Sequence, residues 1–394
     1  MLSGKQGPAT AKAMEILVAL GEIYGAEKLL PVVSAQVAGV SYGNLGQAGL
    51  DFLRAWADQG ARAVVPTTLN PAGMDLEAWQ QLGVPEPYAR HQLEVIEAYR
   101  SMGLAISCSC TPYLSGNVPE FGQHLAWSES SAVSYANSVL GARTNREGGP
   151  SALAAAITGR APAYGLHLDE NRKATLVVDV RCTPQSWADF GALGYLVGQQ
   201  AGDQVPYFRF APAQRPCLDE LKALGAAMAA SGAVALYHVH DVTPEARLGD
   251  VVEPDAATLT IESLDDGYRA LDGTRPAVDL VWIGCPHASL MEIEQTAGLL
   301  QGRQLTSRLW ITAHRDVIRE AKARGLMEPI KKSGGRMVAD ACLLGAPLEE
   351  MDITSIATNS GKAAFYLRSR HDVQVRFGSL ERCVEAAATG VWPA

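Results

Sequence analysis

Predicted strands and helices alternate along almost the whole chain, and this alternation constrains the fold more than any other feature. Short apolar segments predict strands at 29–40, 61–70, 104–110, 174–180, 233–239, 279–284, 308–313 and 373–377. Segments with helical spacing of apolar residues lie among them, at 9–24, 46–60, 85–103, 218–232, 291–302 and 315–325. Because strands separated by helices pair in sheets that the helices cover, the sequence predicts an α/β fold of α/β/α layers with largely parallel sheets.

The length and composition allow two or three domains. The 394 residues are 47% hydrophobic and 19% charged, which is enough to build more than one buried core. Loop-like stretches at GRAPAYGLHLDENR and across 245–275 predict α/β regions at 1–165, 166–275 and 276–394. The first region would carry the substrate loops and one candidate metal-binding cysteine, and the third would carry two such cysteines.

Charge and hydropathy restrict the partners of the chain. The formal net charge of -9 argues against nucleic acid or an anionic membrane as a partner, because both require clustered Lys and Arg. No uninterrupted apolar run of about 18 residues predicts a membrane span, and the N-terminus has no cleavable apolar signal. We therefore expect a cytoplasmic protein with a small-molecule substrate.

Common signatures of nucleotide, hydrolase and zinc sites are absent from the sequence. It contains no P-loop, no GxGxxG or GxSxG motif, no HExxH helix and no paired CxxC. Its seven cysteines are an odd number spread over a long chain, which is not typical of a disulfide framework. Reduced thiols are expected, some of them as metal ligands.

Three cysteines stand in similar loops next to predicted strands: Cys110 in SCTPY, Cys285 in IGCPH and Cys342 in VADACLLGAP. Loops at the carboxyl ends of parallel strands converge, so these thiols are expected to meet. Three thiolates suit an iron-sulfur cluster in which one iron lacks a cysteine and can assist the removal of a hydroxyl. A single buried cysteine is more often a small apolar core residue, and we expect that role for Cys108.

The segment from Cys110 to Pro150 is too rich in polar residues to be ordinary core. Within it, Arg143 and Arg146 in GARTNREGG carry planar guanidinium groups that suit carboxylate or phosphate. A structural salt bridge is an equally common role for one arginine taken alone. Because Asn and Gly residues surround both arginines, we expect them to bind an anionic substrate.

Further candidates lie at predicted helix starts. Glu129 and Ser130, in WSESS, offer a carboxylate and a hydroxyl, although the same residue types commonly cap helices. Lys362 follows a Ser-Gly turn in TNSGKAAFY, where an anion could bind, although most lysines are simply solvated. His167 and His287 are candidates for hydrogen bonds to groups that bind the metal, or else are satisfied structural histidines.

Long stretches of the chain resemble the aconitase X family of the aconitase superfamily over almost its entire length. The strings that carry the resemblance are AMEILVALGEIYGAEKLLPVVSAQVAGVSYGNLGQAGLDFL, TTLNPAGMD, CTPYLSGNVPEFGQHLAWSESSAVSYANSVLGARTNREGGPSALAAAITG, YGLHLDENRKA and SGK at 360–362. The resemblance implies an aconitase-like fold without the swivel domain, and a hydro-lyase that uses an iron-sulfur cluster, with 4Fe-4S as the expected form.

The resemblance also implies roles for individual residues. The cluster ligands would be Cys110, Cys285 and Cys342, the same three that the loops single out. The substrate contacts would be Gly39, Val40, Ser41, Asn70, Pro71, Glu129, Ser130 and Lys362. A small swivel-domain subunit would complete the site as a heterodimer and carry the general base, so no catalytic base is expected in this chain.

Two branches of the family differ in substrate. AGVSY and NREGGPSA are similar to the archaeal-type branch, which implies dehydration of (R)-5-phosphomevalonate to trans-anhydromevalonate 5-phosphate in a modified mevalonate pathway of isoprenoid biosynthesis. The alternatives are the branch that dehydrates cis-3-hydroxy-L-proline, or a dehydratase of another hydroxy acid. The alternative that is not an enzyme is a non-catalytic iron-sulfur sensor.

Overall fold

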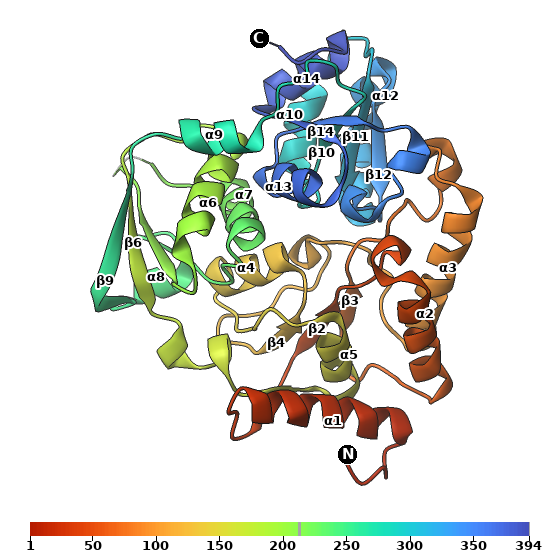
Figure 1. Ribbon diagram of the computed structural model, residues 1–394, viewed down its shortest axis with the longest axis vertical. Helices are drawn as coiled ribbons and strands as arrows, with labels where there is room; N and C mark the ends of the chain where they lie inside the picture. The colour runs from red at the N-terminus through yellow and green to blue at the C-terminus, as the bar shows by residue number, and fades with distance from the viewer. Residues whose placement is uncertain (212–213, 394) are drawn as a thin grey trace.

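Three parallel sheets organise the molecule, as the alternation of strands and helices predicts (Figure 1). The computed structural model describes residues 1–211 and 214–393. Among the named strands of these residues, only β1 (Leu29–Pro31) and β5 (Arg160–Pro162) pair antiparallel. The expected α/β class with largely parallel sheets is therefore confirmed.

The first sheet has the strand order β3-β2-β4 and is covered by helices from the first half of the chain. Its strands are β2 (Ser34–Val37), β3 (Thr67–Leu69) and β4 (Leu125–Trp127), and its helices are α1 (Pro8–Ile23), α2 (Tyr42–Asp58), α3 (Glu86–Ser101), α4 (Ser130–Ser138) and α5 (Gly149–Thr158). Pro8 suits the first turn of α1 because its missing N–H would have no helical partner. Ala13 and Leu17, one turn apart, are fully buried.

The second sheet has the order β8-β7-β6-β9. Its strands are β6 (Ala174–Val180), β7 (Pro206–Arg209), β8 (His238–Val239) and β9 (Val252–Ile261), with α6 (Trp187–Ala201), α7 (Leu218–Ser231), α8 (Pro244–Leu248) and α9 (Asp265–Leu271). Ser186 and Asp189 form a capping box at the start of α6. Gly194 lets α6 approach α7 closely, because a Cβ there would lie 2.4 Å from the carbonyl oxygen of Leu224.

The third sheet is five-stranded and parallel, in the order β12-β11-β10-β13-β14. Its strands are β10 (Leu280–Ile283), β11 (Arg308–Ala313), β12 (Arg336–Ala339), β13 (Ser355–Thr358) and β14 (Gln374–Phe377), with α10 (Leu290–Leu299), α11 (Arg315–Ala323), α12 (Met327–Ser333), α13 (Gly361–Arg370) and α14 (Leu380–Thr389). Side chains of β10 alternate between two apolar clusters, one with α10 and α14 and one with α13. This sheet is thus buried on both faces, as parallel sheets usually are.

Short 3₁₀ helices occupy several connections: η1 (Trp79–Leu82), η2 (Pro112–Leu114), η3 (Gly165–His167), η4 (Asp169–Asn171), η5 (Leu343–Gly345) and η6 (Glu349–Met351). No helix of the part of the chain described here is long and apolar enough to cross a bilayer.

Some predicted strands differ from those observed. The segment 29–40 splits into β1 and β2, and 233–239 contributes only the two residues of β8. The strand expected at 104–110 is wrong: only Ala105 forms an isolated bridge, and Cys108 has a φ of 41°, which interrupts an extended chain. Conversely, β9 lies within 245–275, where we expected a loop.

Loops that leave the carboxyl ends of strands in the first and third sheets face each other. In the first sheet these are the loops after β2, β3 and β4, and in the third sheet those after β10, β12 and β13. Helix α13 lies between the five-stranded sheet and α7 (Figure 1). Ligands of α/β proteins collect at such carboxyl edges, and here two edges enclose one cavity.

Candidate active site

The cavity between the two sheets has a volume of about 210 Å³. It is lined by Ala38, Gly39, Asn44, Asn70, Pro71, Cys110, Ser128, Glu129, Ser130, Arg146, Trp282, Gly284, Cys285, His287, Ala341, Cys342, Leu344, Lys362, Tyr366 and Arg370. A larger groove of about 860 Å³ runs along α3, but no cysteine, histidine or lysine lines it. The smaller cavity is therefore the candidate active site, because it gathers the reactive side chains.

Most of the residues expected from the sequence line this cavity. They are Gly39, Asn70, Pro71, Cys110, Glu129, Ser130, Arg146, Cys285, Cys342 and Lys362. Val40, Ser41 and Arg143 do not line it. The cavity wall thus combines residues separated by most of the length of the chain.

A buried ion pair joins the two sheets. Lys362 donates to the Glu129 carboxylate and, over 3.1 Å, to Ser131 Oγ. Burial alone would raise the pKa of Glu129, but the Lys362 ammonium outweighs it and lowers that pKa to about 2. Burial would likewise lower the pKa of Lys362, and the Glu129 carboxylate raises it instead. Both groups therefore stay charged at neutral pH.

Glu129 also caps α4, while it lines the cavity. Its Oε1 accepts a hydrogen bond from Ser131 N, while its Oε2 accepts one of 2.8 Å from Asn70 Nδ2. Asn70 follows β3 and Glu129 follows β4, so neighbouring strands fix the carboxylate from two sides.

Gln36 holds these loops in place, and the sequence analysis missed it. This fully buried side chain on β2 accepts a hydrogen bond of 3.0 Å from Glu129 N. It also donates to Asn70 Oδ1 over 3.5 Å and to the Ser109 carbonyl over 3.3 Å. A polar residue inside an otherwise apolar strand was the available signal, because a buried amide needs polar partners.

The three expected cysteines come from three separate loops and are free thiols. Cys110 and Cys285 are 8% and 9% exposed, and Cys342 is half-buried. Burial raises the pKa of Cys110 to about 12 and that of Cys342 to about 11, although Lys362 lowers both. Burial also raises the pKa of Cys285, again against the effect of Lys362. Cys108, by contrast, is fully buried in the core, as expected.

His287 organises the cysteine loops through three hydrogen bonds. Its backbone N–H donates to Cys110 Sγ over 3.1 Å, and its Nε2 donates to the Ala341 carbonyl over 2.9 Å. Nδ1 therefore accepts from Ser109 Oγ, 3.2 Å away. Burial lowers the pKa of His287 to about 4, so the ring is neutral at physiological pH. This placement agrees with the supporting role considered for His287.

The donor set suits a cluster better than a single ion. Within residues 1–211 and 214–393, no group of three His, Cys, Asp or Glu side chains is arranged to hold one metal ion. A cluster needs thiolates set further apart, because its own iron and sulfide atoms lie between them. Three free thiols line one cavity, which fits this requirement, and Lys362 lowers their pKa values against the larger effect of burial.

Comparison with known proteins agrees with this arrangement. Sequence models of the first, second and third domains of aconitase X match residues 1–170, 174–268 and 278–389. The phosphomevalonate dehydratase large subunit of Methanocaldococcus jannaschii is 47% identical over 98% of this chain and 97% of that protein. The chain belongs to the aconitase X family. The resemblance inferred from its sequence is thereby confirmed.

Two further relatives are a solved aconitase X structure and a dehydratase with a different substrate in its name. The crystal structure of Thermococcus kodakaraensis aconitase X in its holo-form superposes with a TM-score of 0.91, at 48% identity, and covers 98% of this chain and 97% of that chain. The cis-3-hydroxy-L-proline dehydratase of Pseudomonas aeruginosa is 38% identical over 100% of this chain but 70% of its own length. The fold of this aconitase X chain is therefore that of a solved relative.

Val40 and Ser41 of this aconitase X chain make contacts beside the cavity. The Val40 carbonyl accepts from Gln92 Nε2 over 2.7 Å. Ser41 Oγ donates to the Gly345 carbonyl over 2.7 Å and lies 3.1 Å from Tyr88 Oη. These contacts tie the start of α2 to the loop after Cys342 and engage the Ser41 hydroxyl.

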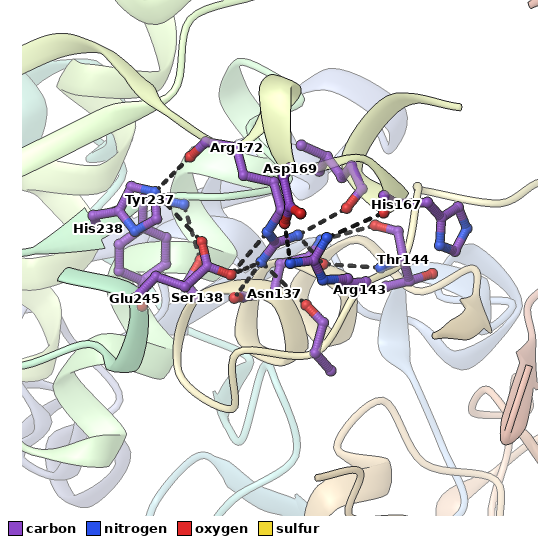
Figure 2. A network of polar contacts seen from close by, with 12 residues as sticks. Asn137, Ser138, Arg143, Thr144, His167, Asp169, Arg172, Tyr237, His238 and Glu245 are labelled. Carbon is purple, nitrogen blue, oxygen red and sulfur yellow. Dashed lines mark hydrogen bonds and ion pairs between the residues drawn. The ribbon is translucent and has the colours of Figure 1, made fainter. Parts of the chain in front are cut away.

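Arg143 lies in a different network, shown in Figure 2. It pairs with Asp169 and donates to the His167 carbonyl over 3.2 Å. Isolated bridges place Arg143 beside His124 and Arg146 beside Trp127, the last residue of β4. Three residues of extended chain span about 10 Å, which separates Arg143 from the carboxyl edge of the sheet. Of these two arginines, only Arg146 lines the cavity and stays a candidate for binding the substrate.

Tyr366 and Arg370 line the cavity but were not singled out from the sequence. Together with Lys362 they occupy positions i, i+4 and i+8 of α13, which share one helix face. This spacing was the signal that could have found them once Lys362 had been chosen.

Proposed function

We propose that this chain is the catalytic large subunit of an iron-sulfur hydro-lyase that dehydrates (R)-5-phosphomevalonate to trans-anhydromevalonate 5-phosphate in a modified mevalonate pathway. The observation that carries the proposal is the meeting of three free cysteines and the Lys362–Glu129 pair on one cavity. Relatives that match this chain over nearly their own full length, at 47% and 50% identity, are named phosphomevalonate dehydratase large subunits, which supports the substrate and the reaction class.

Cys110, Cys285 and Cys342 would hold the cluster, with 4Fe-4S as the expected form. When bound, such a cluster supplies a Lewis acid that favours departure of the substrate hydroxyl. The hydrogen bond from the His287 N–H to Cys110 Sγ would stabilise that sulfur as a thiolate.

Residues of the chain would bind and orient the substrate. Lys362 remains protonated and can donate a hydrogen bond to a substrate carboxylate, while Glu129 remains ionised and can only accept hydrogen bonds. Asn70, Pro71, Gly39 and Ser130 form the surrounding wall. Val40 and Ser41 would contribute backbone N–H groups, and Arg146 would attract an anion. Ordered donors near the reacting carboxylate would stabilise the charge that develops when a proton leaves the adjacent carbon.

A partner subunit would complete the site. The relatives are named large subunits, which implies a small subunit, and we propose that it is a swivel-domain protein carrying the general base. We retain the three α/β regions, with boundaries near 165 and 275, as the proposed domains of the large subunit. A cytoplasmic location suits a metabolic enzyme with reduced thiols.

The direct test is anaerobic co-expression with the small subunit, followed by assay of (R)-5-phosphomevalonate and cis-3-hydroxy-L-proline side by side. We expect activity on the phosphorylated acid alone, with loss of iron and activity in Cys285→Ser. Cys217→Ser is the matched control, because Cys217 is exposed and does not line the cavity. Iron content and visible absorption separate loss of the cluster from loss of catalysis.

The outcomes distinguish the alternatives. Activity on the proline derivative alone would assign the chain to the branch of the Pseudomonas aeruginosa relative. A full cluster with no turnover of either compound would favour another hydroxy acid or a regulatory iron-sulfur protein.

A further inference from the structure

One face of α13 points three side chains into the cavity wall: Lys362, Tyr366 and Arg370. Lys362, near the start of the helix, is buried and paired with Glu129. Arg370 is the last residue of the helix and is exposed. Eight residues of helix rise about 12 Å, so the two cations mark the inner and outer ends of the cavity.

The guanidinium group of Arg370 is directed by an aromatic ring. It lies over Tyr366, 4.4 Å from the ring centroid. Tyr366 is 9% exposed and lines the cavity, so stacking turns the arginine back along the helix towards the site. A merely solvated arginine would gain little from that orientation, although a cation does suit the C-terminal end of a helix.

The N–H donors of Arg370 are unpaired among the residues that the structure describes. Within residues 1–211 and 214–393, no carboxylate lies within 4.0 Å of it, and it makes no hydrogen bond that meets the usual distance and angle limits. Arg146, which is also exposed and lines the same cavity, forms no ion pair with the described residues either, and its one hydrogen bond among them is a long contact of 3.4 Å to the Ala229 carbonyl. Two exposed guanidinium groups therefore line the cavity with most of their N–H donors unpaired among the described residues.

The charge of the cavity is unusual for this protein. Lys362 is balanced by Glu129, whereas Arg146 and Arg370 add two uncompensated positive charges to a chain of net charge -9. Arginine forks match phosphate oxygens two at a time, which a lysine cannot do. The outer end of the cavity is therefore suited to a dianionic group.

We propose that Arg146 and Arg370 form a phosphate clamp at the outer end of the cavity, and that this clamp selects phosphorylated over unphosphorylated hydroxy acids. The proposal rests on the proposed function, and it states where in the cavity each end of that substrate would bind. The carboxylate lies towards Lys362 at the inner end, and the phosphate lies between the two arginines. Tyr366 acts as a positioning residue by holding Arg370 in place.

The test compares (R)-5-phosphomevalonate with unphosphorylated mevalonate in the holoenzyme complex. Arg370→Gln is expected to reduce the ratio of their kcat/KM values roughly 10- to 100-fold, mainly through KM for the phosphorylated acid. Arg146→Gln is expected to act in the same direction. Arg370→Lys should recover part of the loss, because it restores charge but not the fork. Arg368→Gln, an exposed arginine of the same helix outside the cavity, is the matched control.

A second readout does not depend on turnover. Inorganic phosphate, titrated calorimetrically into the holo complex, is expected to bind the wild type and the Arg368→Gln control, and to bind Arg370→Gln at least 10-fold more weakly. If the wild type fails to dehydrate phosphomevalonate, the proposed function fails while this titration still decides the clamp. Equal phosphate affinity in Arg370→Gln and the wild type, or equal loss of kcat/KM for both acids, would overturn the clamp.

Discussion

The ammonium of Lys362 and the carboxylate of Glu129 are buried together, with side chains 6% and 12% exposed, and each stays charged because the other is present. An isolated charge at this depth would be costly, since burial removes most of its hydration. The pair also joins α13 of the third sheet to the loop after β4 of the first. This one ion pair therefore both keeps two charges in the cavity and holds the first and third sheets together.

We predict strong coupling between these two residues in stability. Lys362→Met or Glu129→Gln alone should lower the free energy of unfolding by about 3 to 5 kcal/mol, because one buried charge loses its partner. The double variant should be less destabilised than the sum of the two. Urea unfolding followed by tryptophan fluorescence measures this, with Lys331→Met, an exposed lysine, as control. Strictly additive effects would contradict the coupling.

Much of the site could be predicted from residue types in their loops. Cys285, Cys342, Glu129 and Asn70 follow strands and Lys362 begins a helix, and such positions converge in parallel sheets, whereas Cys110 follows only an isolated bridge. Gln36 and Arg370 needed other signals, namely a polar residue inside an apolar strand for Gln36 and helical spacing from Lys362 for Arg370. Arg143 and Arg146 looked alike in sequence, and only their pairing along β4 separates them.

At the scale of elements, α7 and α10 are joined by a second buried charge cluster. Lys222 of α7 is 4% exposed and contacts Glu292 of α10 and Asp219. Burial would lower the pKa of Lys222, but these two carboxylates raise it. Its ammonium also donates to the His287 carbonyl over 3.4 Å, next to the loop that carries Cys285. This charge cluster therefore helps to hold the loop that carries Cys285 into the cavity wall.

We predict that Lys222→Met loosens this loop. The variant should be destabilised by about 3 kcal/mol, because Glu292 and Asp219 lose their cation. It should also make Cys285 react faster with a thiol reagent in metal-free protein, since the loop loses a hydrogen bond. Mass spectrometry of the modified cysteine gives the rate. An unchanged Cys285 rate, with Lys331→Met as reference, would show that Lys222 does not restrain the loop.

Elements with a strong pattern were predicted well, and edge or irregular segments were not. Helix α1 and strands β6 and β11 fall where the sequence places them, because their buried faces impose a clear apolar spacing. Strand β9 escaped notice because most of its side chains are exposed or half-buried, so no apolar pattern marks it. The segment 104–110 is apolar like a strand, yet Cys108 bends it out of the sheet.

For the whole molecule, the network in Figure 2 joins the first part of the chain to the second. Arg172, 3% exposed, pairs with Glu245 and donates to the carbonyls of Asn137 and Ala142. His124 and His167 lie at its border, with their Nδ1 atoms 3.0 Å apart. Burial lowers the pKa of both histidines, and that of His167 falls to about 3, since His124 and nearby arginines add to the effect.

This network predicts sensitivity to acid. An unfolded histidine titrates near pH 6.5, so below that pH the unfolded chain binds more protons than the folded protein. The free energy of unfolding should therefore fall as the pH drops from about 6.5 towards 3. His167 alone should contribute about 2 kcal/mol of loss by pH 5.

Thermal unfolding at pH 7 and pH 5 tests this expectation. His167→Asn should show a smaller drop in stability between the two pH values than the wild type. His91→Asn, a partly exposed histidine on α3, is the control and should match the wild type. An identical drop in His167→Asn would exclude His167 as a source of acid sensitivity.

The three cysteines are far apart along the chain, so they are synthesised at different times. Cys110 emerges from the ribosome long before Cys285, and Cys342 emerges only when the last part of the third sheet is being made. A nascent chain that ends before Cys342 cannot offer all three thiols at once. If these cysteines hold the proposed cluster, its set of ligands is complete only after Cys342 has been synthesised, when most of the chain already exists.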